Sequence, residues 1–182
     1  MPERFEFEVI FALPEGEHDA FALSDTVFEA GYPDAVVGTG NARLLAVALE
    51  DDGDDAATVI LRAARAIIAH LPPGAELREV RPDLVSLAEV AEKLKVKRQA
   101  LQQREMPPPV GVGLYRIDEM REALLAAVQP KPGRRRARFD LPAADKWFKA
   151  GIAARRLNAE LTLRRLDPVT IQAVAPAADP DR

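Results

Sequence analysis

The chain has 182 residues, 48% hydrophobic and 30% charged, which is ordinary for a globular protein of one or two domains. It has no cysteine, which excludes disulfides, cysteine nucleophiles and cysteine-ligated zinc, and no apolar run approaches the length of a membrane span. Its charge is uneven. Residues 1–83 carry 6 Lys/Arg and 17 Asp/Glu, whereas residues 84–182 carry 19 and 12. This asymmetry predicts two modules with different partners, the basic one being a candidate for a polyanion.

The first predicted element is a half-buried strand, because "RFEFEVIFAL" alternates apolar and polar residues. Its apolar face comprises Phe5, Phe7, Val9, Phe11 and Leu13. A helical pattern follows over residues 19–30, and Gly31 stands where a helix-ending glycine is expected.

The rest of the acidic half predicts a hairpin, a helix and a fourth strand. The runs "DAVVGTG" and "ARLLAVALE" indicate the hairpin, and residues 51–55 an acidic turn. A helix over about 55–71, capped by Asp54 or Asp55, precedes the strand "AELREVRP". The order β-α-β-β-α-β is that of a ferredoxin-like fold with two helices on one face of the sheet. We therefore expect residues 1–82 to form an acidic module for dimerisation or sensing.

The basic half opens with a predicted pair of short helices. Ser86 and Glu89 have the spacing of a capping box for a helix over about 87–94. Residues 95–97 form the turn, and a second helix covers about 97–104. Its outward side chains are Lys97, Arg98, Gln99, Gln102, Gln103 and Arg104. Arginine and glutamine suit base edges in a major groove, and lysine suits phosphates.

This pair resembles the helix-turn-helix of bacterial DNA-binding proteins, in which the second helix enters the major groove. The segment that follows is similar to the wing of MerR- and excisionase-type winged helices. The resemblance implies a wing strand at Pro109-Val110, a tip at Gly111-Val112-Gly113, a return strand at Leu114-Tyr115-Arg116, and Asp118 capping a helix to about Val128. The winged helix-turn-helix would span residues 83–128. The wider chain resembles uncharacterised bacterial proteins that join an acidic ferredoxin-like start to such a unit.

Two positions depart from that pattern. Lys95 stands where the turn often has glycine, and a positive φ there would cost roughly 1 kcal/mol. Lys97 stands where serine or threonine often caps the second helix, so the cap is lost. Both lysines add positive charge near the expected phosphate surface. The departures fit either an exchange of stability for phosphate affinity or a degenerate unit that only packs.

Three segments follow. Residues 129–140 form a basic linker, and Arg134, Arg135 and Arg136 could follow a phosphate backbone or enter a minor groove, or simply be solvated. Residues 141–167 contain a helix whose apolar stripe, with Trp147 and Leu157, packs within the chain or pairs with a second copy. Residues 168–182 lack a clear period, and we expect a flexible tail.

These features predict an α+β protein that binds double-stranded DNA sequence-specifically. We expect it to act as a homodimeric transcriptional regulator in the cytoplasm, associated with the nucleoid. The expected contacts are Lys95, Lys97, Arg98, Gln99, Gln102, Gln103, Arg104, Tyr115, Arg116, Arg134, Arg135 and Arg136. The alternative is an interaction adaptor whose basic half docks an acidic partner. No P-loop, nucleophile elbow, HExxH or paired-carboxylate motif is present, so we expect no enzyme, cofactor, metal or membrane partner.

Overall fold

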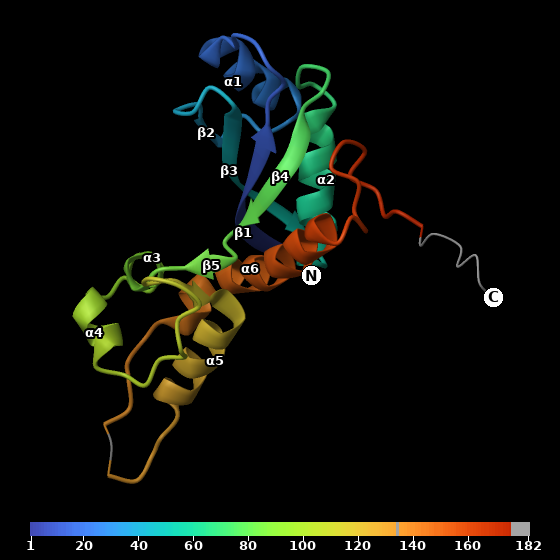
Figure 1. Ribbon diagram of the computed structural model, residues 1–182. Helices are drawn as coiled ribbons and strands as arrows, with labels where there is room; N and C mark the ends of the chain where they lie inside the picture. The colour runs from blue at the N-terminus through green and yellow to red at the C-terminus, as the bar shows by residue number, and fades with distance from the viewer. Residues whose placement is uncertain (134, 176–182) are drawn as a thin grey trace, which may run out of the picture.

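The computed structural model describes residues 1–133 and 135–175 and has a mixed α+β architecture. The described residues contain six helices, a four-stranded antiparallel sheet and a two-stranded sheet (Figure 1). The elements of the acidic half are β1 (Glu3–Ala12), α1 (Ala20–Glu29), β2 (Val36–Gly38), β3 (Leu44–Gly53), α2 (Ala56–Ile68) and β4 (Glu76–Arg81). The strands lie in the order β2-β3-β1-β4, and every neighbouring pair is antiparallel.

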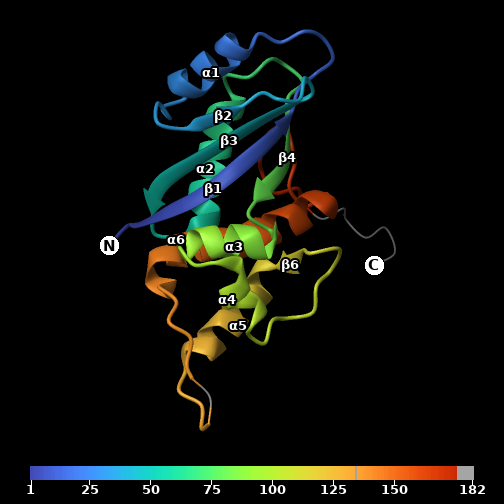
Figure 2. The ribbon, with the colours of Figure 1, turned by 90° about the vertical axis from the view of Figure 1, so that its left-hand side faces the viewer.

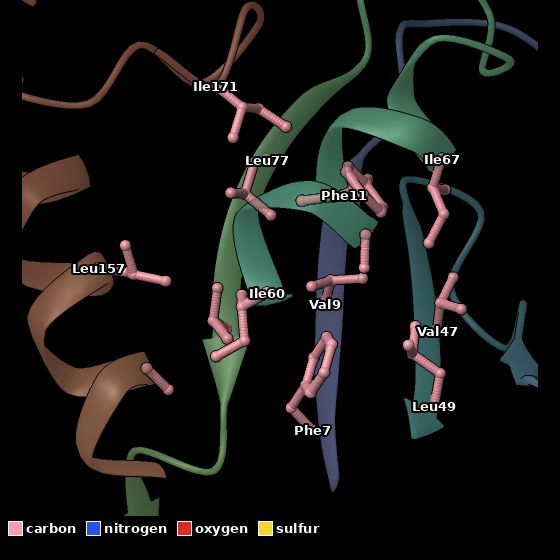
Figure 3. Close-up of a cluster of buried hydrophobic side chains, with 14 of the residues drawn as sticks. Phe7, Val9, Phe11, Val47, Leu49, Ile60, Ile67, Leu77, Leu157 and Ile171 are labelled. Carbon is pink, nitrogen blue, oxygen red and sulfur yellow. The ribbon is translucent and has the colours of Figure 1, made fainter. Parts of the chain in front are cut away.

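The alternation of β1 decides which face of the sheet is covered. The five residues of the predicted apolar face are buried, as the sequence predicts: Phe5, Phe7, Val9, Phe11 and Leu13, the last of which lies just beyond the end of β1. Figure 3 shows the side chains of Phe7, Val9 and Phe11 in one cluster with Ile60 and Ile67 of α2, with Val47 and Leu49 of β3 alongside. Burial of these large side chains supplies most of the driving force for this half of the fold.

The start of α2 follows the predicted capping, because the Asp55 carboxylate accepts a hydrogen bond from the Thr58 backbone N–H at 2.8 Å. The start of α1 is capped in the same way, since the Asp19 carboxylate accepts one from the Ala22 backbone N–H at 2.8 Å. The predicted acidic turn is corrected, because β3 continues through Gly53 and includes Asp51 and Asp52. Cross-strand pairing explains the longer strand, since Arg4 lies opposite Asp52 and their side chains meet at 3.0 Å.

The helices on the covered face are also not the predicted pair. α2 and the C-terminal half of α6 (Leu141–Thr162) pack side by side on the sheet, while α1 contributes Leu23 and Val27 at one end. The acidic half therefore completes its core with a helix that lies about 60 residues further along the chain than β4.

The basic half forms a second core around a compact set of short elements. These are β5 (Leu84–Val85), α3 (Leu87–Lys93), α4 (Arg98–Gln102), β6 (Tyr115–Arg116) and α5 (Ile117–Val128). Leu101 of α4 and Met120 and Leu124 of α5 are fully buried there, against Trp147 and Phe148 of α6. The Trp147 and Phe148 rings meet edge to face, with centroids 5.1 Å apart.

Helix α6 thus belongs to both cores, and its predicted apolar stripe packs within its own chain. Figure 2 shows it crossing the molecule between the sheet above and α4 and α5 below. Asn158 fixes it to the edge of β4, donating to the Val80 carbonyl and accepting from the Val80 N–H, each at 2.8 Å. One amide side chain therefore satisfies both backbone groups that a neighbouring strand would have paired.

The segment after α6 corrects the expectation of a flexible tail for its described part. Ile171 is fully buried in the first core, and its carbonyl accepts a hydrogen bond from Arg65 at 2.8 Å. The Pro168 carbonyl accepts one from the Leu77 N–H of β4 at 2.8 Å. Residues 176–182 lie outside the described part of the chain. Among the helices that the structure describes, none has the length and apolar character needed to cross a bilayer.

Gly151 of α6 allows a close crossing, and its replacement by alanine tests how tightly α6 is held. A Cβ there would stand 3.0 Å from the Pro82 carbonyl oxygen and overlap the Ile117 side chain. Alanine gains about 1 kcal/mol in helix propensity, but overpacking costs about 1–3 kcal/mol. We expect Gly151→Ala to lower the free energy of unfolding in urea by about 1 kcal/mol. The exposed Arg156→Ala is the control, and a stabilised Gly151→Ala variant would contradict the crossing.

Asp145 of α6 predicts a pH dependence. Partial burial alone would raise the pKa of its carboxyl, but hydrogen bonds from Lys149 and Arg121 outweigh burial and lower that pKa below its ordinary value of 3.8. A lowered folded-state pKa stabilises the fold above the unfolded-state value, and this contribution is lost as the pH falls through the folded-state pKa. Asp145→Asn should therefore cost about 0.5–1 kcal/mol near pH 7, and the deficit should shrink near pH 3.

Urea denaturation of Asp145→Asn and the native chain at both pH values measures the difference. Glu17 is exposed and has no ion pair with a described residue, so Glu17→Gln is the matched control. A constant difference between Asp145→Asn and the native chain at the two pH values would contradict the assignment.

Candidate nucleic-acid interface

The first helix of the basic half begins as predicted. The Ser86 hydroxyl accepts a hydrogen bond from the Glu89 N–H at 3.2 Å, and the Glu89 carboxylate accepts one from the Ser86 N–H at 2.7 Å. These two bonds form the capping box at the start of α3. On its inner side, Leu87, Val90 and Ala91 are buried, which orients α3 against α4.

The turn between α3 and α4 has the geometry of a Schellman motif. The Val96 N–H donates to the Ala91 carbonyl at 2.9 Å, and the Lys95 N–H donates to the Glu92 carbonyl at 3.1 Å. Lys95 has a φ of 53°, the left-handed conformation that favours glycine. The positive φ that would strain a lysine is therefore present, and the Lys95 side chain is exposed.

Helix α4 is shorter than predicted and lacks a side-chain cap. It spans residues 98–102 rather than 97–104, and Lys97, at its N-cap position, makes no capping hydrogen bond. The fully buried Leu101 anchors it. On the other side, the exposed side chains are Lys97, Arg98, Gln99, Gln102 and Gln103. Arg98 and Gln102 are four residues apart and so share one face.

Helix α4 lies away from the sheet of the acidic half (Figure 1). Figure 1 places α4 at the opposite end of the molecule from α1 and β2, and Arg98 and Gln102 are exposed. The sheet therefore does not cover the side chains that would have to meet base edges.

The predicted wing is present only in part. A tight turn joins Val110 to Leu114, whose carbonyl accepts a hydrogen bond from the Val110 N–H at 2.9 Å, and Gly113 has a φ of 69°. The proposed strand at Pro109-Val110 is corrected, because the return strand β6 pairs with β5 instead, Tyr115 opposite Val85. Pro109 has no N–H to donate to a ladder, so this segment is a poor strand partner. Val112 stands fully exposed at the tip.

The start of α5 differs from the prediction as well. Arg116 occupies the N-cap position, and Asp118 lies within the first turn rather than capping the helix. The carboxylate of Asp118 faces Arg155 of α6 at 3.2 Å, and Arg155 also meets Asp83 at 3.1 Å. Asp118 is therefore oriented by α6, a helix that local sequence reasoning could not place beside it.

Many cations of the basic half are paired with carboxylates. Lys93 pairs with Glu6 of β1, Lys146 with Glu50 at 3.0 Å, and Lys149 with Glu3 at 2.7 Å. Arg121 pairs with Asp145 at 3.0 Å. The net positive charge of residues 84–182 is consequently not all available to a ligand. Three of these pairs join α3 or α6 to β1 or β3 of the acidic half.

Other cations are free of such pairs among the described residues. Lys95, Lys97 and Arg98 make no ion pair with any described carboxylate, and all three are exposed. Arg116 differs, because it meets Glu119 at 3.0 Å. Tyr115 is half-buried against the second core, so its ring is only partly accessible. The turn and the start of α4 therefore carry three exposed cations without an ion pair among the described residues.

The basic linker lies beside the end of α4. The Arg104 guanidinium donates to the Arg135 carbonyl at 2.9 Å, and the Ala137 N–H donates to the Ala127 carbonyl at 3.0 Å. A cavity of about 470 Å³ is lined by Arg104, Arg135 and Arg136 together with residues of α5. Arg135 and Arg136 are exposed, and Arg134 lies outside the described residues. The Arg104–Arg135 contact joins segments 31 residues apart, and no local sequence signal indicates it.

Lys95 provides a test of the turn. A left-handed conformation costs a residue other than glycine about 1–2 kcal/mol, and glycine loses part of that gain through chain entropy. We expect Lys95→Gly to raise the free energy of unfolding by up to about 1 kcal/mol relative to Lys95→Ala. Both variants remove the same charge, so the difference in urea denaturation isolates the backbone. Equal stability of the two variants would contradict a strained turn.

Comparison of the chain with protein-family models, with curated proteins and with solved structures found no match. A function therefore has to be inferred from the exposed residues of the basic half, their charge and their separation from the acidic half.

Proposed function

We propose that this chain is a sequence-specific DNA-binding protein, a transcriptional regulator, in which α4 reads the major groove. One observation carries the proposal: the polar face of α4 is exposed and adjoins the unpaired cations Lys95, Lys97 and Arg98, while other cations are bound to carboxylates. Arg98 can pair with a guanine edge and Gln102 with an adenine edge. Lys95 and Lys97 would neutralise phosphates and release counterions.

The proposal extends to the architecture. Residues 1–82 would be a ferredoxin-like module, a reading supported by the element order and by the sheet order β2-β3-β1-β4. Residues 83–128 would be a winged helix-turn-helix similar to that of the MerR and excisionase type. The capping box, the turn at Lys95 and the tight turn before β6 support this reading. α6 would be the structural helix that joins the two modules.

The remaining contacts are assigned by position. Gln99 and Gln103 extend the exposed face of α4, while Arg104, Tyr115 and Arg116 flank it and would contact the backbone. Arg134, Arg135 and Arg136 would follow the phosphates or enter a minor groove. Double-stranded DNA and a second copy of the chain are the proposed partners, and the proposed location in the cell is the nucleoid. No catalytic step is part of the proposal.

Salt-dependent binding to duplex DNA tests the proposal. Fluorescence anisotropy with a random duplex should show an affinity that falls steeply with added salt, and selection from a random duplex pool should return a preferred sequence. Arg98→Ala/Gln102→Ala should lose the preference, at about 1–3 kcal/mol for each base contact, while keeping non-specific binding.

Replacing Arg134, Arg135 and Arg136 by alanine should weaken binding to all sequences alike and reduce the salt slope by up to about 3. Lys146→Ala is the matched control, because it also removes a cation but one that is paired with Glu50. If the native protein binds no duplex at low salt, DNA binding is excluded, and if Arg98→Ala/Gln102→Ala keeps the sequence preference, base reading by α4 is excluded. If Lys146→Ala weakens binding as much as the linker variant, the linker contacts are excluded. Retention of an acidic protein partner after nuclease treatment would then favour the adaptor.

A further inference from the structure

The cavity between the end of α4, helix α5 and the basic linker has the size of a small-molecule site. Its volume of about 470 Å³ lies within the range of roughly 300–1,000 Å³ that is usual for such sites. The Ala137 N–H of the linker donates to the Ala127 carbonyl at 3.0 Å, and both ribbon views show the orange linker returning past the end of α5 (Figures 1 and 2). We call this space the linker cavity, and its lining includes Arg104, Met106, Ala123, Ala126, Ala127 and Arg136.

The linker cavity has apolar walls, and small side chains keep it open. Ala123, Ala126 and Ala127 are three and four residues apart on α5, so they share one face of that helix. Met106 and Pro107, both half-buried, add to the lining from the segment after α4. A methyl group leaves space that a longer side chain on α5 would fill. The cavity therefore has room for the apolar part of a ligand.

Cations outnumber carboxylates in the lining. It contains three glutamates and four cations: Arg104, Lys131, Arg135 and Arg136. One of the glutamates, Glu119, is already paired with Arg116 at 3.0 Å. None of the four cations makes an ion pair with a carboxylate in the described part of the chain. The excess of positive charge favours an anionic ligand.

Arg104 is the cation best placed to hold the charged group of that ligand. It is half-buried, whereas the other three cations of the lining are exposed. Its Nη1 donates to the Arg135 carbonyl at 2.9 Å, which holds the guanidinium against the linker. The guanidinium makes no other hydrogen bond to a described residue, so further N–H groups remain for an anion. Charge-assisted hydrogen bonds from arginine to a carboxylate are among the stronger ones in proteins.

We propose that the linker cavity binds a small organic anion with an apolar body, such as an aromatic or branched carboxylate or sulfonate. The charged group bonds to Arg104, and the apolar body packs against Met106 and the alanines of α5. An inorganic anion would leave the apolar walls in water, and a neutral apolar molecule would leave Arg104 without a partner. Both parts of the ligand are therefore needed to fill the site.

A ligand in the cavity would compete with DNA. Arg104, Arg135 and Arg136 line the cavity and also belong to the surface proposed to contact phosphates. An anion bound to them would therefore weaken duplex binding, and a bound duplex would weaken binding of the anion by the same factor. This competition rests on the proposed function, whereas the cavity and its ligand do not.

Fluorescence titration of the full chain with two dyes tests the site. 1-Anilinonaphthalene-8-sulfonate has an apolar body and an anionic group, and N-phenyl-1-naphthylamine has the same body without the sulfonate. The native protein should bind the sulfonate dye saturably and about tenfold more tightly than the neutral dye. Arg104→Met should remove this preference and leave the affinity for the neutral dye unchanged. Arg156→Met is the matched control, because Arg156 is an exposed arginine of α6 outside the cavity.

A second variant tests the apolar walls. Ala126→Phe should occupy the cavity and weaken binding of both dyes about tenfold or more. Ala126 is exposed, so the fold should persist, which circular dichroism and the melting temperature can verify. Ala159→Phe is the matched control, because Ala159 is an exposed alanine of α6 that does not line the cavity.

Three results would overturn the inference. One is the absence of saturable binding of the sulfonate dye to the native protein. Another is an Arg104→Met variant that keeps the preference for the sulfonate dye or loses affinity for both dyes equally. The third is an Ala126→Phe variant that binds the dyes as tightly as Ala159→Phe does.

Mobility-shift titration of a random duplex, with and without the sulfonate dye, tests the competition separately. The dye should weaken duplex binding by the native protein but not by Ala126→Phe. A protein that binds the dye in the expected way but binds no duplex would contradict the proposed function and leave the cavity site standing. Duplex affinity that the bound dye does not change would contradict the competition.

Discussion

The structure depends on one helix that completes two hydrophobic cores. The C-terminal half of α6 packs on the sheet beside α2, and its N-terminal half places Trp147 and Phe148 against α3, α4 and α5. Asn158 bonds to the edge of β4, and Gly151 permits the close approach of Pro82 and Ile117. Neither half buries its apolar face without α6, so the two halves form a continuous unit and the position of α4 relative to the sheet is fixed by packing.

The distribution of charge follows from the same arrangement. Because α3 and α6 lie against the acidic half, Lys93, Lys146 and Lys149 are paired with Glu6, Glu50 and Glu3. Each exposed ion pair of this kind contributes little to the stability of the fold. It does balance the charge of its lysine, so that lysine attracts a polyanion less strongly. The cations at the α3–α4 turn are outside that arrangement. The cations of the basic half therefore include some that are paired with carboxylates of the acidic half and others that are exposed without such a partner among the described residues.

The turn places lysine at two positions where another residue would be more stable. Lys95 occupies a left-handed position where glycine would be unstrained, and Lys97 occupies an N-cap position without capping α4. Helix α4 therefore depends on the burial of Leu101 rather than on local capping. Both lysines are exposed beside Arg98 and Gln102. The positive φ and the missing cap lower the stability of the turn, and the two lysines raise the positive potential of the surface proposed to meet DNA.

The sequence by itself determined the features that arise from local periodicity and capping: the buried face of β1 and the capping box at Ser86 and Glu89. These depend on residues within a few positions of one another, which is why a single sequence carries them. Only the tertiary structure decided that α6 serves both cores, that β6 pairs with β5, that Asp118 meets Arg155, and that Ile171 is buried. Each of these joins residues far apart in the chain, and the competition among distant partners is settled by packing rather than by any local pattern.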